Sequence, residues 1–312
     1  MQASQSAQPD PLWTEVKVDG TRLDRAIADW RGLSRAAVGR MLEHGAITCN
    51  GRVMARANKG DLLRAGDRLE LMAAYAGGEV PLPDGSVALK VLVYGEGYLV
   101  VDKPAGVPVR PHALDEKGTV INAVAARNPE VIGVGEGGLR SGVVHRLDND
   151  TSGTLLVATQ QDAWDRFRKA FAEHCIQKRY AALVHGVPEE AGTSKRDLTV
   201  TTHRPARVKV QREGTGGEDA RMCSLSWQVI ERFGDRASLV EVDLHTGFLH
   251  QVRAMMSDLG HPVVGDGVYG DPSYDLPAPR QMLHAKSLAF EEVQVEAPLP
   301  TDMQQLMQTL RG

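Results

Sequence analysis

Cysteine is scarce in this chain of 312 residues, which contains only Cys49, Cys175 and Cys223. The three lie far apart and show none of the paired spacings of zinc sites, so the sequence predicts neither a metal site nor a disulfide framework. No apolar run reaches the roughly 20 residues of a membrane helix, and residues 1–11 are polar, unlike a signal sequence. We therefore expect a protein of the reducing cytoplasm with no membrane partner.

An excess of positive charge is also missing, because 36 Lys and Arg stand against 40 Asp and Glu, for a formal net charge of −4. This balance gives no overall electrostatic reason to bind nucleic acid. Residues 21–70 differ, with ten Lys and Arg against six Asp and Glu. A basic segment in a mildly acidic chain favours a phosphate-contacting surface, although an exposed helix face rich in arginine would give the same count.

The length of the chain suits one small and one large domain, and its 42% hydrophobic content is ordinary for a protein with a sizeable core. Glycine and proline gather in residues 73–87, which is typical of a linker. We expect a monomer. Four segments are predicted: a flexible tail (1–11), a small domain (12–75), a linker (76–86) and a large domain (87–312).

A polar loop at residues 145–153 reads His-Arg-Leu-Asp-Asn-Asp-Thr-Ser-Gly and lies between two apolar runs. We expect residues 141–144 to lead in as a short strand and residues 154–158 to lead out as another. Asp148 and Asp150 taken singly would be explained as turn residues that bond their own backbone. So many polar side chains within nine residues, however, indicate a functional loop rather than a core-building one.

Together with Arg140 and Gly142 just ahead of it, this loop resembles the catalytic motif of the RluA-type pseudouridine synthases, which modify large-subunit ribosomal RNA. The resemblance implies that Asp148 is the essential residue. It also implies an RNA substrate, either ribosomal RNA or transfer RNA, which relatives with similar motifs modify. Three further segments resemble motifs of the same family and extend the likeness over most of the chain: residues 100–106, 178–186 and 238–270.

The same resemblance implies roles for other site residues. Tyr180 stands at the position of the family's active-site tyrosine, which would stack on the extruded uracil and could help to remove the proton from C5. Arg253 stands at the position of its basic residue. Extruding a base costs roughly a few kcal/mol, and Arg146, from the same loop as Asp148, could fill the gap that the base leaves.

One segment departs from the family pattern. Where the family has Gly-Arg-Thr-His-Gln, residues 247–251 read Gly-Phe-Leu-His-Gln, so a polar, basic pair has become apolar. Since His250, Gln251 and Arg253 remain, the departure weakens the expected RNA contact more than the chemistry. We still place His250 and Gln251 among the candidate RNA contacts.

The implied reaction explains why so few residues are needed. Pseudouridine formation breaks the bond from the ribose to N1 of uracil, turns the base and joins the ribose to C5. Nothing is oxidised or hydrolysed, so we expect no cofactor and no metal. Asp148 must be ionised to act, and because burial favours the neutral form, a cation has to oppose that effect. Arg253 is the expected partner. Attack on the sugar, attack on the base and assistance to a glycal intermediate all remain open.

The front of the chain predicts two helices followed by a hairpin. Ser34 is a candidate N-cap for the second helix and Gly45 ends it. Asn50-Gly51, between apolar residues, is a strong signal for a two-residue hairpin. Apolar residues at helical spacing define the two helices: Leu23, Ile27 and Trp30 in the first, and Val38, Met41 and Leu42 in the second.

This order of elements resembles the small S-four-like RNA-binding module, named after a ribosomal small-subunit protein, which often precedes pseudouridine synthase domains. The resemblance implies phosphate contacts from its basic side chains. A second basic stretch, residues 203–212, is predicted as a hairpin tip that is either solvated or in contact with RNA. The candidate phosphate contacts of the front module are Arg22, Arg25, Arg35, Arg40 and Arg52.

The predicted fold class is α+β: a mostly antiparallel mixed sheet with a central active-site cleft around Asp148, preceded by a small α/β RNA-binding domain. Two other functions stay open. A glycosidase-like hydrolase also attacks an anomeric carbon, but it would usually need a second carboxylate, for which Asp150 is the candidate. A non-catalytic RNA-binding or ribosome-assembly protein on the same fold is the other, and the intact Asp148, Tyr180 and Arg253 speak against it.

Overall fold

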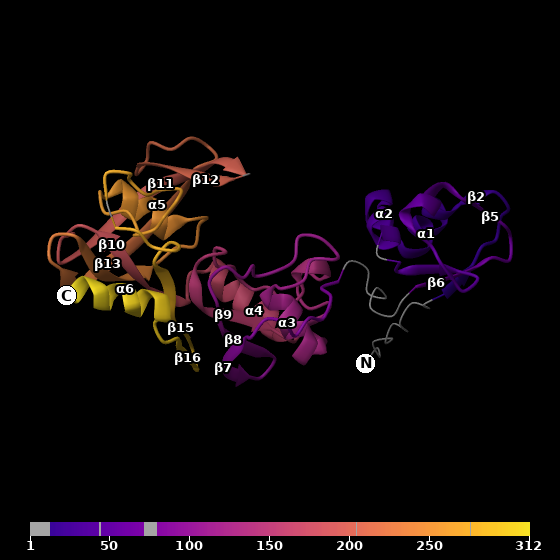
Figure 1. Ribbon diagram of the computed structural model, residues 1–312, viewed down its shortest axis with the longest axis horizontal. Coiled ribbons are helices and arrows are strands. Elements are labelled where there is room, and N and C mark those ends of the chain that lie inside the picture. The colour runs from indigo at the N-terminus through magenta and orange to yellow at the C-terminus, as the bar shows by residue number, and fades with distance from the viewer. Residues whose placement is uncertain (1–12, 44, 72–79, 204, 275) are drawn as a thin grey trace, which may run out of the picture. The chain divides into compact units, whose positions relative to one another are not determined.

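The structure is a computed structural model that describes residues 13–43, 45–71, 80–203, 205–274 and 276–312 (Figure 1). The predicted tail, residues 76–79 of the predicted linker and the side chain of Arg40 lie outside the described residues. The architecture is α+β, as predicted, with a large and mostly antiparallel sheet. The chain forms two compact units, one from residues 1–86 and 110–142 and one from residues 87–109 and 143–312.

The first unit begins with a small sheet and two helices. The sheet has the order β1-β6-β3-β4, and β2 pairs with β5 beside it. The helices are α1 (Leu23–Arg31) and α2 (Arg35–Glu43). The strands are β1 (Trp13–Glu15), β2 (Thr21–Arg22), β3 (Ile47–Cys49), β4 (Arg52–Val53), β5 (Leu62–Leu63) and β6 (Arg68–Leu71), with a 3-10 turn at Arg56–Gly60.

Local signals placed these elements correctly. The hydroxyl of Ser34 accepts a hydrogen bond from the backbone N–H of Ala37 at 3.2 Å, as expected of an N-cap. Asn50 and Gly51 have φ angles of 50° and 77°, the left-handed pair that a tight hairpin requires. The predicted apolar stripes form the core, where Leu23, Ile27, Val38, Met41 and Leu42 are buried and Trp30 packs against them.

The first unit also contains residues 110–142, which the sequence had assigned to the large domain. Leu114 belongs to the same buried cluster as Leu23 and Ile27. Helix α3 (Val120–Arg127) begins at Thr119, whose hydroxyl accepts from the N–H of Asn122 at 3.2 Å. Two 3-10 turns follow, at Pro129–Val131 and Gly138–Arg140.

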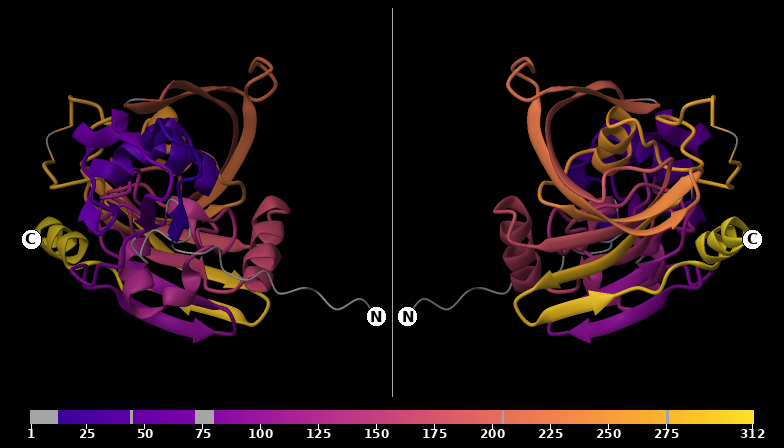
Figure 2. Two further views of the ribbon diagram at one scale, coloured as in Figure 1. Left: turned by 90° about the vertical axis from the view of Figure 1, so that its right-hand side faces the viewer. Right: turned by 90° about the vertical axis from the view of Figure 1, so that its left-hand side faces the viewer.

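The second unit is built on a ten-stranded sheet with the order β12-β11-β13-β14-β10-β15-β9-β8-β7, and β16 pairs with β15. Strands β11 to β13 curve away from β7 to β9, which form the other end of the sheet (Figure 2). The strands are β7 (Lys90–Gly95), β8 (Tyr98–Lys103), β9 (Ser152–Ala158), β10 (Gln177–His185), β11 (Ala191–His203), β12 (Ala206–Arg212), β13 (Arg221–Phe233), β14 (Ala237–Leu244), β15 (Leu283–Phe290) and β16 (Val293–Glu296).

Three helices cover this sheet. Helix α4 (Gln161–Ala172) buries Phe167 against Tyr98 and Phe290, with ring centroids 5.0 and 6.1 Å away. Helix α5 (Gln251–Asp258) packs into the cluster formed by β10 to β14. Helix α6 (Thr301–Arg311) buries Met303 and Met307 in a third cluster.

The predicted lead-in strand at residues 141–144 is wrong. Only Val143 makes a bridge, with Val157, while β9 runs beside β8 and β15. The pairing of β9 with β15 is parallel and joins Ser152 to His284 and Gly153 to Ala285. Gly153 has a φ of 112°, and a Cβ there would collide with the backbone of Ala285, so only glycine suits this approach.

Candidate active site

The polar loop 145–153 is held by its backbone. Lys103, which is fully buried, donates from Nζ to the carbonyl of Asn149 at 2.7 Å and to two carbonyls of its own turn. Burial lowers the pKa of Lys103 to about 8. From the other side, Arg280 donates to the carbonyl of Asp150 at 2.9 Å, and Gln281 donates to the hydroxyl of Thr151 at 3.0 Å. These contacts fix the path of the chain on both sides of Asp148.

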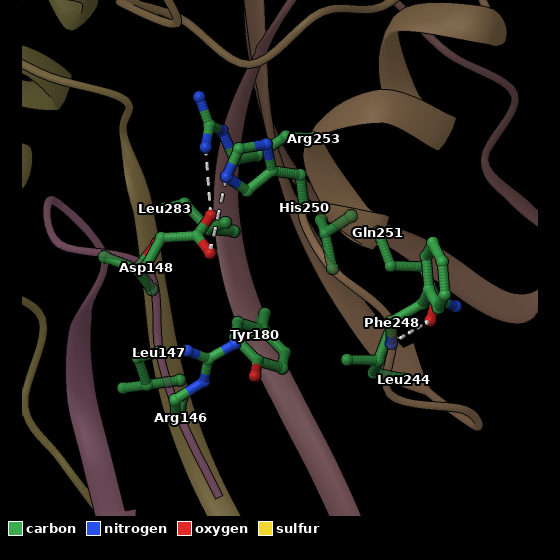
Figure 3. A pocket seen from close by; sticks show the side chains of 12 residues that line it. Arg146, Leu147, Asp148, Tyr180, Leu244, Phe248, His250, Gln251, Arg253 and Leu283 are labelled. Carbon is green, nitrogen blue, oxygen red and sulfur yellow. Dashed lines mark hydrogen bonds and ion pairs between the residues drawn. The ribbon is translucent and has the colours of Figure 1, made fainter. Parts of the chain in front are cut away.

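The carboxylate of Asp148 faces an arginine, as the sequence predicted. Arg253 on α5 donates from Nη1 to Oδ2 of Asp148 at 3.0 Å (Figure 3). The other edge of the guanidinium makes two hydrogen bonds to Asp266, of 2.6 and 2.8 Å. The side chain of Asp266 is 0% exposed and that of Arg253 6%, whereas that of Asp148 is 23% exposed. Asp266 therefore orients Arg253, and Asp148 keeps access to the pocket.

Electrostatics keep Arg253 and Asp266 charged. Burial lowers the pKa of Arg253, but the hydrogen bonds and charges of Asp266 and Asp148 outweigh that effect and raise it above its ordinary value. Burial raises the pKa of Asp266, and the hydrogen bonds and charge of Arg253 outweigh it, so the net shift is downward. A permanent cation thus lies next to Asp148, which is the arrangement that stabilises an ionised carboxylate.

His250 lies on the other side of Asp148, where the chain turns into α5 with a φ of 53°. Its Nε2 is 3.9 Å from Oδ1 of Asp148. Its Nδ1 is 3.0 Å from the hydroxyl of Tyr269. Burial lowers the pKa of His250, with the charge of Arg253 adding to that effect and Asp148 and Asp266 opposing it. The ring is therefore neutral at neutral pH.

An open pocket of about 360 Å³, including space open to solvent, surrounds these groups. Tyr180, on β10, lines it, and burial followed by the charge of Asp148 raises the pKa of its hydroxyl, which keeps it protonated. Arg146 lines it as well and is exposed. Among the described residues that line this pocket, Asp148 is the one carboxylate. The pocket brings together six residues that were named from the sequence: Arg146, Asp148, Tyr180, His250, Gln251 and Arg253.

Gln251 holds the backbone rather than facing solvent. It is buried, its Oε1 accepts from Thr246 at 2.9 Å and from the N–H of Phe248 at 3.1 Å, and its Nε2 donates to Ser224 at 3.0 Å. Both Oε1 and Nε2 thus make hydrogen bonds within the protein, and the RNA contact expected of Gln251 stays a prediction. Phe248 and Leu249, the departure from the family pattern, pack against the buried cluster under the pocket.

The arginines predicted to contact phosphate belong to the other compact unit. Arg22 donates to Asp24 at 3.0 Å, and Arg25 lies 3.7 Å from Asp29. Arg35 and Arg52 are exposed. Four arginines whose side chains are described are thus at least partly exposed, two of them in ion pairs on their own helix or at its start.

Sequence reasoning missed three residues of the site: Lys103, Asp266 and Tyr269. All three lie in segments that resemble family motifs, and that was the available signal. Within the described part of the chain, no group of three or more His, Cys, Asp or Glu side chains could hold a metal ion. No helix among these residues is long and apolar enough to cross a membrane.

The chain is similar to known proteins over most of its length. A model of the RNA pseudouridylate synthase family matches residues 97–258. An uncharacterized RNA pseudouridine synthase from Synechocystis is 34% identical over 305 residues, which cover 94% of this chain and 90% of that protein. A ribosomal large subunit pseudouridine synthase D from Xanthomonas campestris is 32% identical over 312 residues, covering 94% and 89%.

Solved structures show the same fold. The human protein RNA pseudouridylate synthase domain containing 1 superimposes with a TM-score of 0.55 and 28% identity, covering 74% of this chain and 97% of that chain. The human protein RNA pseudouridylate synthase domain containing 4 gives a TM-score of 0.58 at 22% identity, covering 71% and 93%.

Proposed function

Since this chain belongs to the family of RNA pseudouridylate synthases, we propose that it isomerises specific uridines of large-subunit ribosomal RNA, with Asp148 as the nucleophile. The enzyme is an RNA pseudouridine synthase, an isomerase. This class of reaction replaces both alternatives that the sequence left open, the glycosidase-like hydrolase and the non-catalytic RNA-binding protein.

One observation carries the assignment of Asp148. Its carboxylate is both partly exposed to the pocket and bonded to a buried cation, Arg253, at 3.0 Å. Asp150, two residues on, has neither feature: it does not line the pocket, and its side chain accepts a long 3.4 Å hydrogen bond from Asn149. Of these two carboxylates, Asp148 is the one that both faces the pocket and is bonded to a buried cation.

The chemistry needs little beyond this arrangement. The N1–C1′ bond breaks, the base turns, the C5–C1′ bond forms, C5 loses a proton and N1 gains one. Atoms and electrons balance without a co-reactant, so we propose that the enzyme uses no cofactor or metal. We propose that Tyr180 stacks on uracil, which is supported by its protonated hydroxyl and its position in the pocket lining. Arg146, exposed on the same loop, is available to fill the gap in the RNA.

The test compares two isosteric variants. Asp148→Asn removes the charge and keeps the shape, so it should bind RNA nearly normally and release no tritium from RNA labelled at C5 of uridine. Asp150→Asn is the matched control and should keep substantial activity. Turnover by Asp148→Asn would refute the assignment, and equal loss in both variants would show that two carboxylates are needed.

The RNA target is proposed from the relatives named as ribosomal large subunit pseudouridine synthases and from the basic front module. We propose that residues 12–75 form an S-four-like module that contacts phosphates through Arg22, Arg25, Arg35, Arg40 and Arg52, and that the protein acts as a monomer in the cytoplasm. Mapping pseudouridines in cells with and without the gene tests the target. Loss of a large-subunit ribosomal site is expected; loss confined to transfer RNA would overturn it.

A further inference from the structure

Arg253 and His250 face Asp148. Behind them lies a second layer of side chains that takes no direct part in the chemistry proposed above. It comes from one turn, residues 266–269. Asp266 accepts the N–H groups of residues 268 and 269 at 2.8 and 3.0 Å, which fixes the turn. Tyr269 lies between the two donors, with the guanidinium of Arg253 5.3 Å from its ring centroid and the ring of His250 at its edge.

The hydroxyl of Tyr269 has a defined direction. It accepts the backbone N–H of Val208, on β12, at 2.9 Å. A phenol has one hydrogen to donate, and among the described residues Nδ1 of His250 lies within hydrogen-bond distance of the Tyr269 hydroxyl, at 3.0 Å. With Nδ1 assigned as the acceptor of that hydrogen, Nδ1 carries a lone pair. In the neutral ring the hydrogen consequently resides on Nε2.

That nitrogen is the one directed at Asp148. Nε2 of His250 lies 3.9 Å from Oδ1, while Arg253 binds the other oxygen, Oδ2, at 3.0 Å. The separation of 3.9 Å is longer than a hydrogen bond, but such contacts commonly shorten when substrate binds. In the opposite tautomer a lone pair on Nε2 would face a carboxylate oxygen, and the two would repel each other.

We propose that His250 is a positioning residue for this reaction, with Tyr269 fixing its tautomer so that Nε2–H holds the second oxygen of Asp148. The inference rests on the proposed role of Asp148 as nucleophile. Arg253 supplies charge to one oxygen and His250 supplies a neutral donor to the other. Two donors on two oxygens stop the carboxylate from rotating about its χ2 bond, and this prepares it for attack.

The tautomer can be measured without substrate. In protein carrying ¹⁵N-labelled histidine, the ring nitrogens of His250 should show the pattern of a neutral ring protonated on Nε2, assigned by its loss in His250→Gln. Tyr269→Phe keeps the ring and removes only the hydroxyl, so the pattern should shift toward Nδ1–H. Its kcat should fall roughly 10-fold, the effect of one hydrogen bond, with KM for RNA unchanged. An Nδ1–H pattern in the unaltered protein, or no change in Tyr269→Phe, overturns the proposal.

A second pair of variants tests the direction of the donor. The amide of Gln reaches the place of Nε2, whereas that of Asn reaches the place of Nδ1. Asn is the better residue for a φ of 53°, so backbone strain works against the expected order. His250→Gln should nevertheless retain more turnover than His250→Asn. The reverse order overturns the proposal. Activity in Asp148→Asn would instead remove the nucleophile assignment and leave the measured tautomer as it stands.

Discussion

Arg253 and Arg25 carry the same guanidinium in opposite surroundings. The side chain of Arg253 is 6% exposed and bonded to two carboxylates at 2.6 to 3.0 Å. That of Arg25 is 68% exposed and lies 3.7 Å from Asp29, which is itself 73% exposed. A buried, doubly bonded arginine has one orientation and suits a reacting centre, whereas an exposed one can follow phosphates at varying positions. Burial, rather than residue type, distinguishes these two arginines.

The largest effect is expected from removing the buried cation. Arg253→Met leaves Asp148 without its charged partner and Asp266 buried and unpaired. Turnover should fall by about 10²- to 10³-fold, as for loss of one preorganised donor, and the free energy of unfolding by about 3–5 kcal/mol. Single-turnover kinetics and denaturant unfolding measure the two losses separately.

A double variant sharpens this result. Arg253→Met combined with Asp266→Asn removes the unpaired buried charge, so stability should recover in part while turnover stays low. Recovery of both would mean that Arg253 acts only through folding. The salt dependence of RNA binding should be nearly unchanged in both variants, because this arginine is proposed to bind no phosphate.

The next largest effect is expected from acid, which lowers the free energy of unfolding because buried histidines resist protonation. Burial lowers the pKa of His284 to about 4 from an ordinary 6.5, and the ring contacts Ser152 at the end of the loop. Its stabilising contribution is complete above pH 6.5 and is lost as the pH falls from 6.5 to about 4, because the unfolded chain takes up the proton first. The loss is on the order of a few kcal/mol.

Unfolding by denaturant at several pH values would check this expectation. His145 adds to the same trend, since burial lowers its pKa to about 3. His284→Gln should make stability depend less steeply on pH, whereas His112→Gln, at an exposed position, should not change the slope. An unaltered slope in His284→Gln would contradict the sign argument.

The smallest effect is expected from the exposed arginines. Arg25→Gln and Arg52→Gln should each lower the slope of log affinity against log salt by roughly 0.7 to 0.9, the share of one phosphate contact. Turnover at saturating RNA should stay normal. Arg311→Gln is the control, because this exposed arginine of the second unit pairs with Glu231 at 2.7 Å. Loss of turnover in Arg25→Gln would contradict the proposal that the exposed arginines contact RNA and take no part in the chemistry.

The sequence predicted what depends on neighbours in the chain. The cap at Ser34 and the hairpin at Asn50-Gly51 were found because their geometry is set within a few residues. The pairing of Asp148 with Arg253, 105 residues apart, was named only through the family resemblance. No local rule contains that contact.

Other parts were missed for the same reason. Strand β15 lies between β10, with which it pairs antiparallel, and β9, with which it pairs in parallel, so its place in the sheet depends on residues far away in the sequence. Lys103 was not named as a site residue, because the three carbonyls that let it be fully buried are brought together only by the fold. The hydrogen bonds of Gln251 to β13 and to the turn ahead of α5 could not be predicted either, because they join residues that no local pattern connects.

The contacts that close the loop from the far side have a consequence for how the enzyme is made. Three hydrogen bonds hold the end of the loop, from Arg280 to Asp150, from Gln281 to Thr151 and between His284 and Ser152. The partners are 130 to 132 residues apart in the sequence. A growing polypeptide therefore carries the entire catalytic motif long before it carries the residues that shape it, and such distant contacts form late in folding. A nascent chain that ends before residue 280 already contains Asp148 but lacks the contacts that hold its loop from this side, so these contacts can form only after residue 284 has been synthesised.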